Sequence, residues 1–235
     1  MRHLLLTRSA YGPDVPLSVN RRRLRLLAGV AARSVSAQAE RDFTWLVLID
    51  PRDPLLRART AAIASAGVPY VLAPAGNMER CYSRADRPQG PWAEAIEWDG
   101  PTLTSRLDDD DAYAPWALSL FTRAAATADR RCILSLPAGY RIYAGRMDVR
   151  VDRLTQFISL YAPTGDRTTV MDVDHTQAPT LAPVEPVTQR PSWLWIRHRD
   201  ARSANSPAST RRREGMVRVT GAIREQFPVD WSLLR

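Results

Sequence analysis

The first 75 residues carry three short apolar runs separated by segments with helical spacing. Residues 4–8 begin with three leucines and end on Thr-Arg, residues 43–49 form a near-continuous β-branched and aromatic run, and residues 69–73 form a third. An unbroken run is typical of a strand buried on both faces, and hence of a parallel sheet. Apolar residues recur at helical spacing over 20–35 and 54–66. We therefore predict the order β-α-β-α-β, typical of a Rossmann-like nucleotide-binding half.

The first of these helices has a clear apolar stripe. Leu24, Leu27, Ala31 and Val35 share one face, and the arginines fall largely off it. Asn20 stands where its side chain would cap the helix N-terminus.

The spacing of apolar residues changes after residue 130. Residues 74–101 are rich in Pro, Gly and polar residues, which predicts a substrate-facing loop or lid. A helix is expected to start near Ala112, and hairpin-like strands follow it. The expected strands cover 132–136, 140–149, 155–161, 168–173 and 192–198, with a loop over 176–191 and a basic helix over 212–226.

Four consecutive aspartates, Asp108 to Asp111, stand at the junction between a β-permissive segment and the expected helix. Four adjacent carboxylates repel one another, so a cation is expected to neutralise them. Ligands of open α/β sheets bind beyond the carboxyl ends of the strands, which is where this run falls. The run therefore predicts a site for a divalent metal and a nucleotide phosphate. The alternative is a solvated acidic turn that caps the helix.

Strand alternation assigns separate roles to these aspartates. At strand-end spacing, Asp108 and Asp110 project to one side and Asp109 to the other, so Asp109 is expected to be a bystander. A hard cation held by one or two carboxylates would neutralise the charge that develops on a departing nucleoside diphosphate.

Composition narrows the classes of partner. The 235 residues carry a formal charge of +8, and every basic residue other than histidine is arginine. This excess favours phosphate-rich partners or an anionic membrane surface, but no nucleic-acid-binding motif accompanies it, so no specific nucleic acid is expected. No apolar run approaches the roughly 20 residues of a membrane span. The isolated Cys81 and Cys132 favour a reducing cytoplasm, with a disulfide as the alternative.

The run Leu107-Asp-Asp-Asp-Asp-Ala112 resembles the "DxD" signature of GT-A glycosyltransferases, and other segments resemble the rhamnosyltransferase family of that fold. They are Thr7-Arg8, Ser34-Val35-x-x-Gln38, Phe43-x-Trp45-Leu-Val-x-x-Asp50, Arg106, Trp193-Leu194 and His198. Family members tend to place an asparagine shortly after the late histidine, where this chain has Arg199-Asp200-Ala201.

The resemblance implies a single GT-A, Rossmann-like α/β domain whose mixed central sheet is flanked by helices. It implies a glycosyltransferase domain over 1–198, with a nucleotide-binding half over 1–112 and an acceptor half over 113–198. Residues 199–235 would form a basic tail or helix. The implied reaction is the metal-dependent transfer of a sugar, rhamnose by the family's name, from a nucleotide-sugar to a hydroxyl of a glycan-type acceptor. The protein is then expected in the cytoplasm, with contact to an anionic membrane through its arginines.

The same resemblance assigns roles to individual residues. Mg²⁺ or Mn²⁺ would be held by Asp108, Asp110 and His198. The nucleotide-sugar would be contacted by Thr7, Arg8, Asp50, Arg106, Asp108 and Asp111. Two of these residues have a simpler alternative, since Asp50 could be a turn former before Pro51 and His198 could merely end a strand. Arg106 could clamp the diphosphate or serve only as a counter-ion for the acids.

A catalytic base is the least constrained assignment. A transfer that inverts the sugar needs a carboxylate or histidine near the acceptor hydroxyl. Asp172, Asp174 and His175 cluster at the end of an expected strand, and Asp174 is the predicted base. Two other functions fit parts of the pattern: a metal-dependent nucleotidyltransferase, and a non-catalytic module that binds polyanions.

Overall fold

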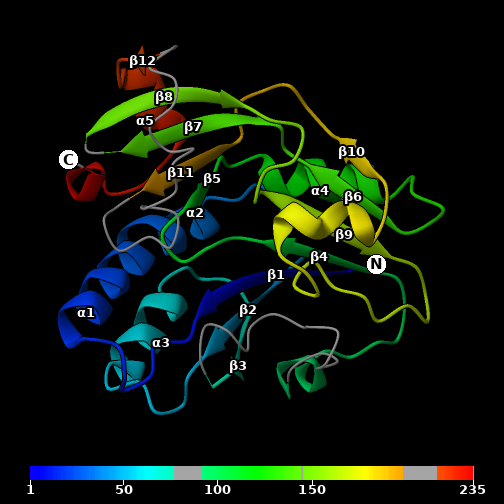
Figure 1. Cartoon of the computed structure of the whole chain (residues 1–235), viewed down its shortest axis with the longest axis horizontal. Coiled ribbons are helices and arrows are strands. Elements are labelled where there is room, and N and C mark those ends of the chain that lie inside the picture. Colours follow the sequence, from blue (N-terminus) through cyan, green and yellow to red (C-terminus); the bar gives the residue numbers. More distant parts are fainter. Residues whose placement is uncertain (77–90, 144, 198–215, 235) are drawn as a thin grey trace.

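A seven-stranded mixed sheet forms the centre of the computed structural model, which describes residues 1–76, 91–143, 145–197 and 216–234 (Figure 1). Its strand order is β10-β6-β9-β4-β1-β2-β3. The strands are β1 (Arg2–Ser9), β2 (Thr44–Ile49), β3 (Tyr70–Pro74), β4 (Thr102–Arg106), β6 (Cys132–Ser135), β9 (Ile158–Ala162) and β10 (Val184–Pro186). Strands β1 to β4 run parallel, whereas β9 is antiparallel to both β4 and β6.

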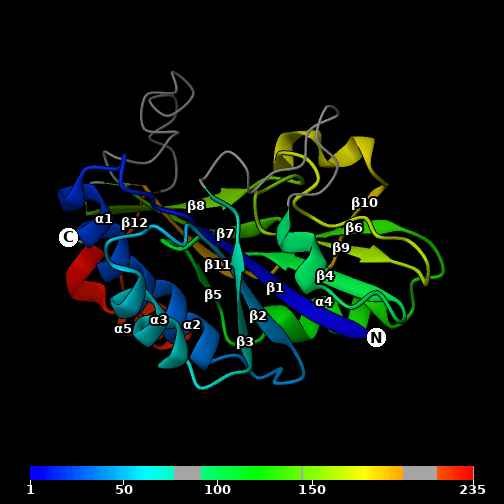
Figure 2. The same cartoon turned by 90° about the horizontal axis from the view of Figure 1, so that it is seen from below.

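Both faces of this sheet are covered, as the unbroken apolar runs predict. One face packs against the helices α1 (Leu17–Leu26), α2 (Ala32–Ser36), α3 (Leu56–Ala64) and α4 (Ala117–Ala125). A π-helical turn, Leu27–Ala31, joins α1 to α2. Figure 2 shows α2, α3 and α4 on one side of the sheet and the short helix His175–Thr180, in yellow, on the other. The fold-class prediction, an α/β domain with a mixed central sheet flanked by helices, is confirmed.

A smaller five-stranded sheet lies beside the first, in the order β12-β8-β7-β11-β5. Its strands are β5 (Ala112–Tyr113), β7 (Ala138–Tyr143), β8 (Arg146–Val151), β11 (Trp193–Arg197) and β12 (Met216–Val217). One face packs on Leu26 and Val30 and on the C-terminal α5 (Gly221–Gln226) and Trp231–Leu234. The described part of the C-terminal segment thus packs into the same fold as the rest of the chain.

Two predictions about helix starts are wrong. Ala112 and Tyr113 form β5 instead of a helix, because they pair with β11 and because Pro115 disfavours a helical Ala114. The helix that follows begins at Ala117. Asn20 does not cap α1, which begins at Leu17 after Pro16; it lies inside the helix, buried.

The second half of the chain also departs from expectation. Residues 140–149 form a hairpin rather than one strand, because Gly145 turns the chain with a φ of 71°. Residues 168–173 form no strand, since the hydroxyl and backbone N–H of Thr169 both donate to Asp172. The loop over 176–191 contains the short helix His175–Thr180 and β10.

The predicted lid over 74–101 is only partly described, since residues 77–90, including Cys81, lie outside the described residues. Its last part is not a substrate-facing loop. Trp92, in a short helix over Pro91–Ala95, is fully buried in the core on the second face of the large sheet. Within the described ranges, no helix is long and apolar enough to cross a membrane.

Candidate functional site

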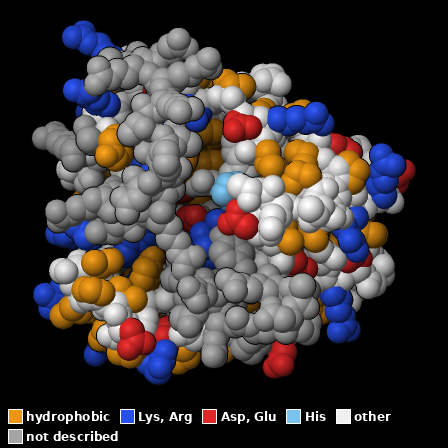
Figure 3. Space-filling model, viewed as in Figure 1, with side chains coloured by type: hydrophobic (Ala, Val, Ile, Leu, Met, Phe, Trp, Pro, Cys, Tyr) orange, Lys and Arg blue, Asp and Glu red, His pale blue; other side chains and the backbone are white. Residues whose placement is uncertain are grey.

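The four aspartates form a turn between β4 and β5, at the carboxyl end of β4, in which all but Asp108 are buried. The turn lies beside the end of β1, since the Leu107 backbone N–H donates to the Leu6 carbonyl at 3.0 Å. Figure 3 shows acidic, basic and histidine side chains meeting near the centre of this face of the molecule. The prediction that the acids follow a buried strand at the sheet's carboxyl edge is correct, although a strand, not a helix, comes next.

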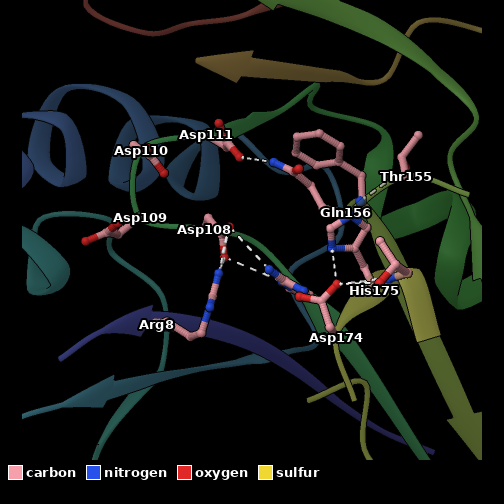
Figure 4. A network of polar contacts seen from close by, with 12 residues as sticks. Arg8, Asp108, Asp109, Asp110, Asp111, Thr155, Gln156, Asp174 and His175 are labelled. Atoms are coloured by element: carbon pink, nitrogen blue, oxygen red, sulfur yellow. Dashed lines mark hydrogen bonds and ion pairs between the residues drawn. The ribbon is translucent and has the colours of Figure 1, made fainter. Parts of the chain in front are cut away.

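Asp108 forms ion pairs with two arginines, Arg8 and Arg106 (Figure 4). Arg8 Nη2 lies 2.8 Å from Oδ1 and 2.9 Å from Oδ2, and Arg106 Nη2 lies 3.4 Å from Oδ2. Burial alone would raise the pKa of Asp108, but the charges and hydrogen bonds of Arg106 and Arg8 hold it well below its usual range. The carboxylate therefore stays ionised, and the cluster of three side chains carries one surplus positive charge.

Asp109 and Asp110 share a different arginine. Arg23 of α1 forms ion pairs with both carboxylates, and Asp109 also accepts hydrogen bonds from Ser9 Oγ at 2.7 Å and the Tyr11 hydroxyl at 3.2 Å. The prediction that Asp109 and Asp110 project to opposite sides is wrong, because both contact Arg23, while the prediction that Asp109 is a bystander to the ligand stays a prediction. Strand alternation does not apply, because β4 ends at Arg106 and the acids lie in a turn. Burial raises the pKa of Asp109, against the charge of Arg23.

A second buried arginine extends this network to α3. The fully buried Arg59 donates to Asp53 Oδ2 at 2.7 Å and to Ser9 Oγ at 2.8 Å. Asn20 donates to Asp53 Oδ1 at 2.7 Å. The network ties the acid turn to two helices, so Asp109 and Asp110 have a structural role.

Asp111 is held by two neutral hydrogen-bond donors. Its Oδ2 accepts a hydrogen bond from Gln156 Nε2 at 2.7 Å, and its Oδ1 accepts one from the Ile196 backbone N–H at 2.8 Å. Burial, together with the nearby charges of Asp110 and Asp108, raises the pKa of Asp111 well above its usual range. The hydrogen bond from Ile196 connects Asp111, and with it the acid turn, to β11.

Asp174 and His175 lie on the side of Asp108 that faces away from Asp109 and Asp110 (Figure 4). Asp174 caps the short helix by accepting from the Thr176 backbone N–H at 3.1 Å, and its Oδ1 lies 3.2 Å from His175 Nδ1. Burial opposes the shift, but the Thr176 N–H and His175 lower the pKa of Asp174. Burial and the charge of Arg106 lower the pKa of His175, so its imidazole is neutral at pH 7.

Two predicted nucleotide contacts lie deeper in the fold. The hydroxyl of Thr7 is buried and accepts a hydrogen bond from Trp45 Nε1 at 2.9 Å. Asp50 is buried as well; hydrogen bonds from Arg52 lower the pKa of its carboxyl against the effect of burial. Gly12 packs on this carboxyl so closely that an added Cβ would lie 2.3 Å from Asp50 Oδ2. Of the predicted nucleotide contacts, the structure gathers Arg8, Arg106 and Asp108 into one cluster.

The predicted metal ligands fit a cation in part. Within the ranges that the structure describes, no three His, Cys, Asp or Glu side chains form a group that could hold an ion. Asp108 is ionised, as a ligand must be, and its side chain is 18% exposed, compared with 9% for Asp110. Mg²⁺ needs only one or two carboxylates when substrate phosphates complete its shell, and Asp108 fits that requirement. His198 lies outside the described residues.

Sequence reasoning missed Arg23, Arg59 and Gln156. The only available signal was the spacing of Asn20 and Arg23, which places both on the helix face that also carries Leu27. Gln156 and the Ile196 backbone N–H left no signal, because their contacts with Asp111 span 45 and 85 residues of sequence.

Comparison with known proteins gives a family for the chain. A family model described as "Putative rhamnosyl transferase" matches residues 20–210. Among solved structures, the chain is similar to "Crystal structure of S. aureus TarS 1-349 in complex with UDP", with a TM-score of 0.49 and 9% sequence identity. That match covers 85% of this chain and 61% of the other, so the chain spans about three fifths of that structure's length. The curated proteins include no match.

Proposed function

Because the chain belongs to the "Putative rhamnosyl transferase" family, and is therefore a glycosyltransferase, we propose that it moves a sugar from a nucleotide-sugar donor to a hydroxyl of a glycan-type acceptor. One observation carries the proposal. Two guanidinium groups, those of Arg8 and Arg106, meet over the ionised Asp108 at the carboxyl ends of β1 and β4. This is the edge at which open α/β sheets bind nucleotides.

The Arg8–Arg106–Asp108 cluster carries the positive charge needed to stabilise the negative charge that develops on the diphosphate during sugar transfer. The acceptor oxygen bonds to the anomeric carbon, the bond from that carbon to the donor phosphate breaks, and its electron pair leaves on the nucleoside diphosphate. Guanidinium groups bind phosphate oxygens in a fixed bidentate geometry and stabilise the charge on the departing group. We assign Arg8 and Arg106 this role, which they can take because their present partner, Asp108, is partly open to solvent.

We also propose that the site uses Mg²⁺ or Mn²⁺. Asp108 would be the principal carboxylate ligand, and Asp110 and His198 are the further predicted ligands. A bound cation would supply Lewis-acid stabilisation of the diphosphate. Either carboxylate can share its lone pairs between an arginine and a cation, but Asp108 is the more exposed of the two.

For the base, we propose that Asp174 and His175 act as a pair. A neutral imidazole can accept the proton of the acceptor hydroxyl, and Asp174, 3.2 Å away, would stabilise the imidazolium that results. This modifies the assignment of Asp174 as the base itself, since a carboxyl with a lowered pKa is a weak proton acceptor.

A panel assay tests this function. The protein is incubated with UDP-, GDP-, dTDP-, CDP- and ADP-sugars, including rhamnose donors, with and without Mn²⁺, and release of the nucleoside diphosphate is measured. Turnover of one nucleotide-sugar, together with thermal stabilisation by its diphosphate and Mn²⁺, supports the proposal. A preference for nucleoside triphosphates indicates a nucleotidyltransferase. Binding that ignores divalent cations and weakens steeply with salt indicates a polyanion-binding module.

A further inference from the structure

The end of β11 carries a buried arginine whose charge the described part of the protein does not satisfy. Arg197 is only 6% exposed, and its Nε and Nη2 are both buried without a hydrogen-bond partner in the structure. A buried guanidinium that lacks an anion lowers the stability of the fold. A bound anion would remove this cost, so Arg197 is a candidate ligand-binding residue.

The two unsatisfied nitrogens are the pair that other arginines of this protein use for carboxylates. Arg8 donates to Asp108 from Nε and Nη2, and Arg141 donates to Asp148 from the same two atoms. This edge of the guanidinium fits two oxygens of a carboxylate or phosphate side by side. In Arg197 the same two nitrogens, Nε and Nη2, have no carboxylate opposite them in the described part of the structure.

The surroundings of Arg197 add positive charge. Burial is the main cause that lowers the pKa of Arg197, and repulsion from the positive charges of Arg141 and Arg150 lowers it further. Asp148 is bound by Arg141 and offsets only one of the three charges. Two rings face the guanidinium, with the Trp195 centroid 5.3 Å and the Tyr143 centroid 6.0 Å from its central carbon. The result is a cationic site with aromatic walls.

Arg197 is the neighbour in sequence of a residue that is hydrogen-bonded to the acid turn of the candidate active site. The residue before Arg197 is Ile196, whose backbone N–H donates to Asp111 of the acid turn. Side chains alternate along a strand, so Arg197 projects to the face of β11 opposite Ile196, which packs in the apolar core beneath. Arg197 therefore lies at the strand end that is bonded to the acid turn, on the face away from that core.

We propose that Arg197 binds an anionic group, a carboxylate or a phosphate, on the acceptor. The role of acceptor rests on the proposed glycosyl transfer, whereas the anion site itself does not. Arg141 and Arg150 strengthen the field at the site, and the preferred acceptors are acidic sugars or phosphorylated glycans rather than neutral ones.

Binding of small probes tests the anion site. Glucuronate, glucose 6-phosphate and glucose are titrated by calorimetry against the wild-type protein, against Arg197→Met and Arg197→Lys, and against Arg123→Met as a matched control on the exposed face of α4. We expect the acidic sugars to bind more tightly than glucose, and Arg197→Met to weaken their binding by about 30-fold or more. Arg197→Lys should restore part of it, and Arg123→Met should change nothing. The two acidic probes separate a carboxylate preference from a phosphate preference.

Two results would overturn the site. One is unchanged binding of both acidic sugars to Arg197→Met. The other is a large loss of thermal stability in that variant, because removal of an unsatisfied buried charge should leave stability equal or raise it. The nucleotide-sugar panel decides the proposed function separately, so turnover without anion binding, or anion binding without turnover, identifies which of the two proposals failed.

Discussion

Arg8 Nη2 contacts both carboxylate oxygens of Asp108, at 2.8 and 2.9 Å, across the ends of the neighbouring parallel strands β1 and β4. A donor diphosphate would compete with Asp108 for this guanidinium. The ion pair therefore orients the Arg8 guanidinium before the donor binds. It also lowers the affinity of Arg8 for phosphate, because Asp108 occupies the same hydrogen-bond donors.

This competition predicts an unusual effect of Asp108→Asn. Removing the carboxylate charge leaves Arg8 and Arg106 with fewer competing interactions, so binding of a nucleoside diphosphate without metal should tighten about tenfold, the equivalent of about 1.4 kcal/mol. Calorimetry in EDTA, using the best diphosphate from the panel, measures the change. Weaker metal-free binding would show that Asp108 itself contacts the ligand favourably.

Arg23 should be essential for stability. Arg23→Met leaves Asp109 and Asp110 buried without their shared cation, which should lower the free energy of unfolding by about 3–5 kcal/mol. The loss should be smaller at pH 5 than at pH 8, because burial raises the pKa of Asp109 and protonation relieves the repulsion. Denaturant unfolding measures both. Arg21→Met, on the exposed side of the same helix, is the control. Equal midpoints for the two variants would refute the structural role.

Asp111 should make stability depend on pH. Its pKa is raised in the folded state, so its contribution is fully present below the unfolded value of about 3.9 and is lost as the pH rises toward the folded value. Asp111→Asn removes this loss, and Gln156 can turn its amide to bond the new side chain. The variant should gain stability relative to the wild type between pH 4 and pH 7. Parallel curves for wild type and variant would contradict the assignment; the exposed Asp129→Asn serves as control.

The Asp174–His175 pair gives a prediction about rate. His175→Gln should slow transfer by about 10²- to 10⁴-fold, the usual contribution of a general base, and Asp174→Asn should have a smaller effect. The wild-type rate should fall at acidic pH as the imidazole becomes protonated, and that limb should be absent in His175→Gln. Rates across pH 5–8 with saturating donor and acceptor provide the measurement. A larger effect of Asp174→Asn would restore the carboxylate as the base.

The parts of this molecule that the sequence predicts are those governed by local pattern. The runs at 4–8, 43–49 and 69–73 are the parallel strands β1 to β3. Burial on both faces explains the unbroken apolar runs of β1 and β2, whereas β3 is a largely exposed edge strand. The position of the acid turn followed from the end of β4 by the same reasoning.

The partners of the acids could not be predicted in this way. Arg23 reaches Asp109 and Asp110 across 86 and 87 residues, and the three-arginine run that contains it looks like solvated surface charge. The alternation rule failed for Asp109 because it holds only within a strand. Ion pairs between distant elements depend on how helices pack on the sheet, which periodicity does not report.

The role of Asp108 as a metal ligand is tested by comparing turnover of the active nucleotide-sugar by wild type and Asp108→Asn in saturating Mn²⁺, with Arg21→Met as a folded control. We predict measurable turnover by the wild type and by the control, and a loss of about 100-fold or more in Asp108→Asn, since a metal at the diphosphate supplies several kcal/mol of stabilisation. An Asp108→Asn variant that turns over its donor at the wild-type rate would contradict the central claim, as would a wild type that turns over no nucleotide-sugar.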